Sequence, residues 1–313
     1  MILALSAQKI YHDPVLVREI VENLQVRPGK TYMDCTLGEG GHTEAIFKSC
    51  AGNVKIIGLD ADPDVLKTSE KRLEQYRDAF SPVNANYADM LRVAHRHSAM
   101  KIDGILMDLG MSSFQLEASG RGFSFLKNEP LDMRFTSFEG ITAGDVVNDY
   151  EEDRLANIIF RFGQEKRSRS IAKAITRNRP ITSSLELAKV ISYGVHSKKN
   201  RIHPATKTFQ AIRIEVNNEL SNLHLGLIQA IELLVPRGRL AVISYHSLED
   251  KLVKEFLKRE SSDCICPVSA PMCKCGHVAS IKIINRKVIK PQDVEVMINS
   301  RSRSARLRVA ERI

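Results

Sequence analysis

The chain lacks several features that define large classes of protein. None of its apolar runs approaches the ~20 residues that a membrane-spanning helix needs, and its first eight residues carry neither a basic segment nor a cleavage site. There is no internal repeat. Nothing besides the presence of six cysteines suggests an oxidising compartment. These absences predict a soluble, cytoplasmic protein with no membrane contact, and no segment indicates an obligate protein partner.

Charge is distributed unevenly along the 313 residues. Residues 161–213 hold 13 Lys and Arg against 2 Asp and Glu, and residues 282–313 hold 9 against 3, whereas the rest of the chain is net acidic. Such segregation favours a polyanionic partner such as nucleic acid. A solvated basic face is the alternative. With 43% hydrophobic residues, the chain can also bury a substantial core, in one large or two ordinary domains.

The most informative stretch is Asp34-Cys35-Thr36-Leu37-Gly38-Glu39-Gly40-Gly41-His42. A short apolar segment precedes it, and the next apolar run, Val54–Leu59, ends in Asp60. Glycines let the backbone turn tightly beside a ligand, the following helix start offers unbonded N–H groups, and an acid at a strand tip accepts ribose hydroxyls. The pattern predicts a nucleoside-cofactor site at the carboxyl edge of a parallel sheet. An ordinary glycine turn is the alternative.

The glycine spacing indicates which cofactor this is. A dinucleotide fingerprint reads G-x-G-x-x-G, but here Gly38-x-Gly40-Gly41 has no third glycine at the required distance, which disfavours a dehydrogenase. The pattern D-x-T-x-G-x-G resembles motif I of class I S-adenosylmethionine (AdoMet) methyltransferases. That resemblance implies that Asp34 helps to hold the methionine amino end and that the glycines pass under the cofactor.

Alternating strand and helix patterns predict a Rossmann-like, doubly wound α/β sheet. We expect an N-terminal helix over 11–24 and a charged helix over 63–76. The predicted strands are residues 31–34, 54–60, 82–87, 102–110, 238–244, 281–284 and 305–309.

More than 120 residues separate Gly110 from the strand at 238–244, far more than a crossover needs. Helical periodicity recurs in this gap, over residues 151–162, 168–178, 184–193 and 208–235. We therefore predict a discontinuous methyltransferase domain, residues 1–111 and 218–313. The insert, residues 112–217, is predicted to be an all-helical, basic subdomain that recognises RNA.

Three residues are candidates for catalysis. Methylating an exocyclic amine is difficult because its lone pair is delocalised, and an acceptor for the amine hydrogens helps the nitrogen become tetrahedral. Asp108 ends a strand and Ser112 follows it, where many amino-methyltransferases hold their catalytic loop; the alternative is that Asp108 only caps the strand or positions cofactor. His246 follows the strand at 238–244. Ser247 and Asp250 fit a helix N-cap pair, which would leave His246 facing the site, although a structural role for it is the alternative.

Basic residues in the insert are candidates for RNA contact. The loops 121–125 and 130–134 mix glycine, aromatic and arginine residues, which suits a lid that stacks on a base and pairs with phosphate. A packed connection to the insert is the alternative. The predicted RNA-binding residues are Arg121, Arg134, Lys166, Arg167, Arg169, Lys207 and Arg213.

Four cysteines form two close pairs, Cys264-x-Cys266 and Cys273-x-Cys275. Zinc sites usually use pairs separated by two to four residues. Because one residue is a tighter spacing, we favour a reduced loop without metal, with a structural zinc site as the alternative. A catalytic metal is not expected.

Several segments together resemble the ribosomal small subunit methyltransferase H family, also called MraW, over nearly the whole chain. They are residues 12–16, 34–42, 108–115, 121–125, 130–134, 203–214, 216–220, 244–250 and 302–308.

The resemblance implies AdoMet-dependent N4-methylation of a cytosine in 16S rRNA near the decoding centre, with the small ribosomal subunit as partner. Tyr87 stands where many relatives carry phenylalanine. Together with Asp34 and Gly38, the implied cofactor residues are Gly40, Gly41, His42, Asp60, Tyr87, Asp108 and Gln115. The residues alone leave open a methyltransferase for a small molecule or another nucleic acid, and a nucleic-acid-binding protein with a degenerate pocket.

Overall fold

The computed structural model describes residues 14–136, 140–194, 203–267, 270 and 272–313. These form two compact units. The sheet unit holds the described residues up to Asp60, with Asp64–Gly110 and Gly226–Ile313; the helical unit holds Ala61–Pro63 and Met111–Leu225. The second boundary falls within a helix, α11 (Glu219–Leu233). The domain limits predicted from the sequence, 111/112 and 217/218, stay predictions.

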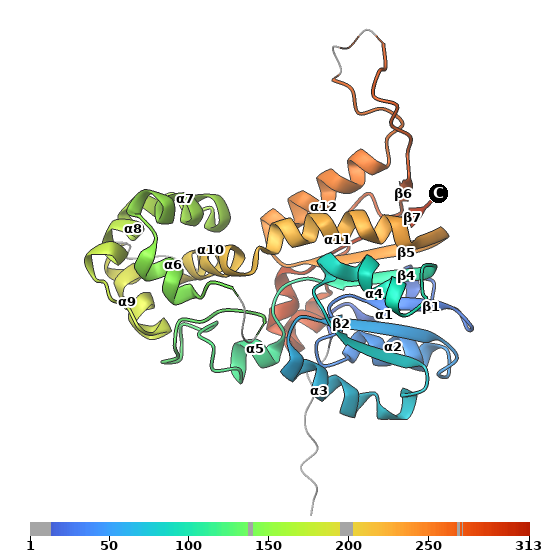
Figure 1. Ribbon diagram of the computed structural model, residues 1–313, viewed down its shortest axis with the longest axis horizontal. Coiled ribbons are helices and arrows are strands. Elements are labelled where there is room, and N and C mark those ends of the chain that lie inside the picture. Colours follow the sequence, from blue (N-terminus) through green and yellow to red (C-terminus); the bar gives the residue numbers. More distant parts are fainter. Residues whose placement is uncertain (1–13, 137–139, 195–202, 268–269, 271) are drawn as a thin grey trace, which may run out of the picture. The chain divides into compact units, whose positions relative to one another are not determined.

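A seven-stranded sheet is the framework of the sheet unit (Figure 1). Its order is β3-β2-β1-β4-β5-β7-β6, in which the first five strands are parallel and β7 is antiparallel to both β5 and β6. The carboxyl ends of the parallel strands therefore meet at one edge. The bounds are β1 Thr31–Asp34, β2 Lys55–Asp60, β3 Phe80–Asn84, β4 Ile102–Asp108, β5 Leu234–Ser244, β6 Ile281–Ile283 and β7 Arg306–Arg312.

The third strand differs from its prediction. It was expected over 82–87, but β3 ends at Asn84, and Tyr87 begins a short 3-10 helix, η2 (Tyr87–Asp89). The Asn86 side chain accepts a hydrogen bond from the Ala88 N–H, which favours the turn over further strand. Pro82, which donates no ladder hydrogen bond, is tolerated because β3 lies at the edge of the sheet.

Helices cover both faces of the sheet. On one face Ile20 of α1 and Phe47 of α2 pack in one apolar cluster with Leu106 and Ile243 from the central strands. On the other face α4 and α11 are joined by a hydrogen bond from the Leu91 N–H to the Gln229 side chain, 2.9 Å long. The helices of this unit are α1 Val17–Asn23, α2 Gly41–Ser49, α3 Pro63–Arg72, η1 Glu74–Tyr76, α4 Met90–Arg96, α12 Ser247–Glu260, α13 Asp293–Ile298 and η3 Ser300–Ser304.

The N-terminal helix is shorter than predicted. Residues 11–13 lie outside the described residues, and α1 begins only at Val17 because Leu16 adopts a left-handed conformation, with φ 55°. A left-handed residue cannot continue a right-handed helix. Within the described residues, no helix is both long and apolar enough to cross a membrane.

The helical unit has its own apolar core, supplied by residues at helical spacing such as Leu155 and Ile159, Ile171 and Ile175, and Leu187 and Ile191. The stretch of helical periodicity over 208–235 contains two helices, because Asn218 ends the first in a left-handed conformation. The helices are α5 Ser113–Glu117, α6 Ala143–Asp149, α7 Glu152–Gly163, α8 Ser168–Arg177, α9 Ser184–Gly194 and α10 Ala205–Asn217.

Candidate active site

The glycine motif forms the turn between β1 and α2. Gly38 and Gly40 have φ angles of 53° and 79°, in the left-handed region that glycine tolerates best. A Cβ atom at Gly41 would lie 2.8 Å from the Pro14 ring, so this glycine is needed for close packing. A Cβ atom at Gly38 would meet only the Thr36 carbonyl oxygen, at an ordinary contact distance of 3.9 Å, so the backbone there is uncrowded. The loop therefore fits a ligand that approaches the main chain at Gly38.

Asp60 lies at the tip of β2 and is hydrogen-bonded to the glycine loop between β1 and α2. The Gly38 N–H donates to Asp60 Oδ2 over 2.8 Å. The structure thus brings together two residues that the sequence assigned to the cofactor from positions 22 residues apart. An acid at the carboxyl end of β2, beside a glycine turn after β1, is the arrangement that holds a nucleoside ribose in Rossmann-like folds.

Asp34 is buried at the end of β1, with 1% of its surface exposed. Its carboxylate accepts hydrogen bonds from the Thr43 hydroxyl at 2.8 Å and from the Thr36 N–H at 3.2 Å. Burial raises its pKa, while His42, Thr43 and Thr36 act in the opposite direction. Asp34 therefore ties β1 to both the loop and α2. Its implied contact with the methionine amino end stays a prediction.

Asp108 ends β4 next to β1 and is the centre of a polar cluster. The Tyr245 hydroxyl donates to Asp108 Oδ1 over 2.8 Å, and the Asp108 N–H donates to Thr36 Oγ1 over 2.6 Å. Burial raises the pKa of Asp108 to about 6, and the negative charges of Asp34 and Glu249 add to this, although His42 and Tyr245 oppose it. Asp108 therefore changes protonation near neutral pH, unlike an ordinary aspartate.

His42 completes this cluster from the first turn of α2. Its Nε2 lies 2.8 Å from the Val15 carbonyl oxygen, which can only accept, so Nε2 carries a hydrogen. Its Nδ1 lies 3.7 Å from Asp108 Oδ2 and holds a second proton only in the charged imidazolium. With 6% of its surface exposed, His42 is held between the Val15 carbonyl oxygen and the Asp108 carboxylate.

His246 caps the start of α12, a role that the sequence analysis assigned to Ser247. His246, not Ser247, is the N-cap of α12: its Nδ1 accepts the Glu249 N–H at 3.3 Å, and Glu249 Oε2 accepts the His246 N–H at 3.2 Å. The predicted Ser247–Asp250 pair is wrong because Asp250 binds the guanidinium groups of Arg306 and Arg308 instead, at 2.9 and 2.8 Å. The catalytic assignment of His246 stays a prediction.

Tyr87 packs closely against α11. A Cβ atom at Gly226 would lie 2.9 Å from the Tyr87 ring and 3.2 Å from Met107, so the absence of a side chain at Gly226 makes room for both. The ring thus lies beside the strand that ends at Asp108. That Tyr87 binds the cofactor is a prediction that this geometry leaves in place.

In the helical unit Ser112 and Gln115 form the capping box of α5. The Ser112 hydroxyl accepts the Gln115 N–H, and Gln115 Oε1 accepts the Ser112 N–H. The Gln115 side-chain amide also donates to Asp62 Oδ2 over 3.3 Å. The hydroxyl of Ser112 therefore serves the helix end, and its predicted catalytic role remains untested.

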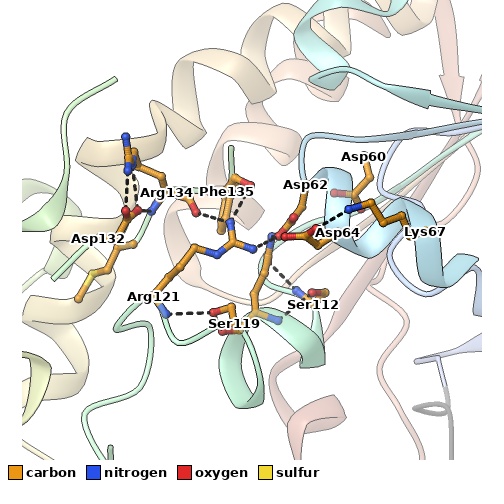
Figure 2. A network of polar contacts seen from close by, with 12 residues as sticks. Asp60, Asp62, Asp64, Lys67, Ser112, Ser119, Arg121, Asp132, Arg134 and Phe135 are labelled. Carbon is orange, nitrogen blue, oxygen red and sulfur yellow. Dashed lines mark hydrogen bonds and ion pairs between the residues drawn. The ribbon is translucent and has the colours of Figure 1, made fainter. Parts of the chain in front are cut away.

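Arg121 is the centre of a polar network in the same unit (Figure 2). Its guanidinium forms an ion pair with the fully buried Asp62 and donates to the carbonyl oxygens of Arg134 and Phe135 at 3.0 and 3.2 Å. Arg134 in turn binds Asp132 through two hydrogen bonds. Both arginines were predicted to bind RNA, but in this structure their charges hold the loop 121–135 together.

The other predicted RNA-binding residues fall into two groups, those bonded to other residues of the unit, Arg213 and Lys207, and those exposed on its surface. Arg213 makes a bidentate ion pair with Glu219, in which the side chains are only 11% and 7% exposed. Lys207 is half-exposed and donates to the Gln164 carbonyl oxygen over 3.1 Å. The rest of the set is exposed on the corner between α7 and α8 and consists of Lys166, Arg167 and Arg169. We call these three the α8 basic corner.

Sequence reasoning missed two residues of the Asp108 cluster. Tyr245 lies within the segment 244–250 that carries the family resemblance, but its link to Asp108 depends on the pairing of β4 with β5. Thr36 is the threonine of the D-x-T pattern and joins β1 to β4. Each follows a strand that lies next to β4 in the sheet, and this strand order was not predicted from the sequence.

Comparison with known proteins extends over nearly the whole chain. The model of a family described as the MraW methylase family matches residues 9–313. A relative from Dehalococcoides mccartyi is 47% identical over 302 residues, which cover 96% of this chain and 86% of the relative. One from Carboxydothermus hydrogenoformans is 47% identical over 306 residues, covering 96% and 98%. One from Clostridioides difficile is 42% identical over 311 residues, covering 97% and 100%. All three bear the name ribosomal RNA small subunit methyltransferase H.

Proposed function

The chain belongs to the MraW methylase family, and we propose on that premise that it methylates N4 of a cytosine in 16S rRNA, near the decoding centre of the small ribosomal subunit. The sheet is that of a class I methyltransferase, and AdoMet is the methyl donor of the family. The names of the relatives support an rRNA substrate. The choice of cytosine N4 rests on the family resemblance and on the chemistry of the Asp108 cluster.

The glycine loop and Asp60 would hold the cofactor. AdoMet supplies a methyl group made electrophilic by its sulfonium sulfur. The open backbone at Gly38 and the acid at the tip of β2 fit the two ends of such a molecule, a methionine moiety and a ribose. Asp34 and Thr43 keep the loop in shape from within the core.

The observation that carries the proposal is the largely buried carboxylate of Asp108, whose side chain keeps 21% of its surface exposed. A cytosine amine is a poor nucleophile because its lone pair is delocalised into the ring, and it must lose a proton when the new C–N bond forms. An ionised Asp108 would accept a hydrogen bond from this amine and so favour the tetrahedral nitrogen. Tyr245 fixes one carboxylate oxygen, and His42 lies near the other. The proton then passes to Asp108 or to water.

The α8 basic corner would supply affinity for the RNA backbone. Phosphate contacts of this kind are independent of sequence and depend strongly on salt. The target base must leave its stack to reach a methyl group held at the sheet edge, so the backbone on either side has to be held while the base is turned out.

The proposal is tested by incubating the protein with tritiated AdoMet and small ribosomal subunits from a strain that lacks this methylation. Nucleosides released from the RNA are then identified by mass spectrometry. We expect the label in N4-methylcytidine with the unmodified chain and little label with Asp108→Asn. Label in another nucleoside, or none although calorimetry shows AdoMet binding, would contradict the proposed reaction.

A further inference from the structure

The segment between α12 and β6 brings four cysteines together. In Figure 1 the described part of residues 261–280 extends away from the sheet beyond these two elements. Cys264, Cys266, Cys273 and Cys275 are all free thiols, and their sulfur atoms all lie within 4.8 Å of one another. They come from two positions along the segment, so its chain doubles back to form the cluster.

The spacing of these sulfurs is that of a metal-thiolate site. Cys273 Sγ lies 3.5 Å from Cys275 Sγ, which lies 3.9 Å from Cys264 Sγ. Four sulfurs around a tetrahedral zinc ion at about 2.3 Å would be about 3.8 Å apart. The distances therefore leave room for the ion at the centre of the four thiols.

Backbone amides are directed at the same sulfurs. The N–H groups of Ile265, Cys266 and Lys274 donate to Cys275, Cys264 and Cys266 respectively, each at 3.4 Å. Hydrogen bonds from the surroundings to coordinating atoms orient ligands and stabilise their charged form. Each Cys-x-Cys pair thus receives support of the kind that thiolates in a metal site require.

Among the described residues of this segment, apolar packing does not account for its conformation. Large apolar side chains there lie on the surface, with Met272 70% and Val278 73% exposed. Its base is fixed by hydrogen bonds from the Ser280 N–H to the Glu260 carbonyl oxygen and from His277 Nε2 to that of Arg259. Short stretches without a core usually need a disulfide or a metal to keep one conformation.

We propose that the four cysteines bind one structural zinc ion. Four protein thiolates fill a tetrahedral shell and leave no open position, which is the property of a structural site rather than a catalytic one. The one-residue spacing within each pair, which made a metal-free loop the favoured interpretation of the sequence, does not prevent all four sulfurs from converging. This proposal is independent of the proposed reaction.

The test is the zinc content of the full-length chain, purified without chelator, incubated with equimolar zinc and desalted. We expect about one zinc per chain from a single site with four cysteine ligands, and none in a variant with all four cysteines changed to serine. Cys50→Ala changes a buried cysteine outside the cluster and should keep the ion. A zinc-free parent protein, or a quadruple variant that retains zinc, would overturn the proposal.

Two further measurements separate metal binding from misfolding and oxidation. X-ray absorption at the zinc edge should give four sulfur neighbours at about 2.3 Å, and a mixed nitrogen–oxygen shell would contradict the site. The quadruple variant should keep the far-ultraviolet circular dichroism and AdoMet affinity of the parent, while its segment 261–280 becomes sensitive to protease. Two disulfides in the freshly purified parent, found by mass spectrometry without reductant, would also overturn the proposal.

Discussion

The carboxyl edge of the sheet and the α8 basic corner use charge in opposite ways. At the sheet edge Asp34 is buried and the Asp108 side chain is only 21% exposed, and this burial raises the pKa of both. On the helical unit Lys166, Arg167 and Arg169 are exposed to solvent and to its ions. Buried charges interact strongly with a few neighbours, whereas exposed charges act weakly and are screened by salt. The first arrangement therefore suits a chemical step and the second suits attraction of a polyanion.

Arg213 tests the comparison most severely, because it is a buried charge within the basic insert. Arg213→Ala leaves Glu219 buried without its partner, which should cost about 3–5 kcal/mol of unfolding free energy. Urea denaturation measures this. The double variant Arg213→Met with Glu219→Gln removes both charges and should recover most of the loss. Unchanged stability of Arg213→Ala would mean that this arginine acts like those of the exposed corner.

Asp108→Asn should lower the methylation rate by about 10²–10³-fold, a typical cost of losing one group that stabilises developing charge. The asparagine keeps the shape of the side chain and can still accept from Tyr245. Because the folded-state pKa of Asp108 is raised, its contribution to stability is full below pH 4 and is lost as the pH rises through about 6. The neutral variant should thus be at least as stable as the parent at pH 8. A slow variant that is also unstable would indicate a structural role.

Asp60→Ala should weaken AdoMet binding by about 1.5–3 kcal/mol, the range for a hydrogen bond to a charged group. The change also removes the acceptor for the Gly38 N–H. Asp64→Ala is the matched control, since Asp64 is an exposed acid in the first turn of α3 that pairs with Lys67. Calorimetry should find a larger dissociation constant for AdoMet with Asp60→Ala only. Equal constants for both would refute the cofactor role of Asp60.

Changing the three residues of the α8 basic corner to glutamate reverses their charge. The resulting loss of RNA affinity should be the smallest of these effects at physiological salt. Each lost phosphate contact should reduce the slope of log affinity against log salt by about 0.7–0.9. Reversing Lys251, Lys254 and Lys258, which are exposed on α12, provides a control with the same change of charge. Filter binding over a salt series should give a flatter slope of log affinity against log salt for the variant of the α8 basic corner alone. The same slope in the parent and the first set would exclude this corner as an RNA contact.

The local pattern of the sequence predicted much of the sheet because three of its parallel strands end in an aspartate. Asp34, Asp60 and Asp108 mark three strand ends, and the glycine motif fixes the turn between β1 and α2. The meeting of Asp60 with Gly38 followed from this topology. The cap of α12 was assigned to the wrong residue because histidine is not a usual capping residue, and only the extended backbone of His246 reveals its role.

Charge pairing could not be predicted in the same way. Arginines in a basic segment are expected to bind RNA. In the folded chain, however, Arg121, Arg134 and Arg213 each form an ion pair with a carboxylate. Arg121 meets Asp62, which lies 59 residues away in the sequence. Whether a basic residue faces solvent or a buried acid depends on tertiary contacts that neither composition nor periodicity contains.

The most direct test of the account is the single-turnover rate of methylation from pH 5 to pH 8, with AdoMet and small subunits saturating. If ionised Asp108 accepts the amine hydrogen, the rate should fall about tenfold per pH unit below a pKa of about 6. Asp108→Asn should be slow and lack this dependence. A parent rate that stays constant across the range would contradict the assignment of the chemical step to Asp108.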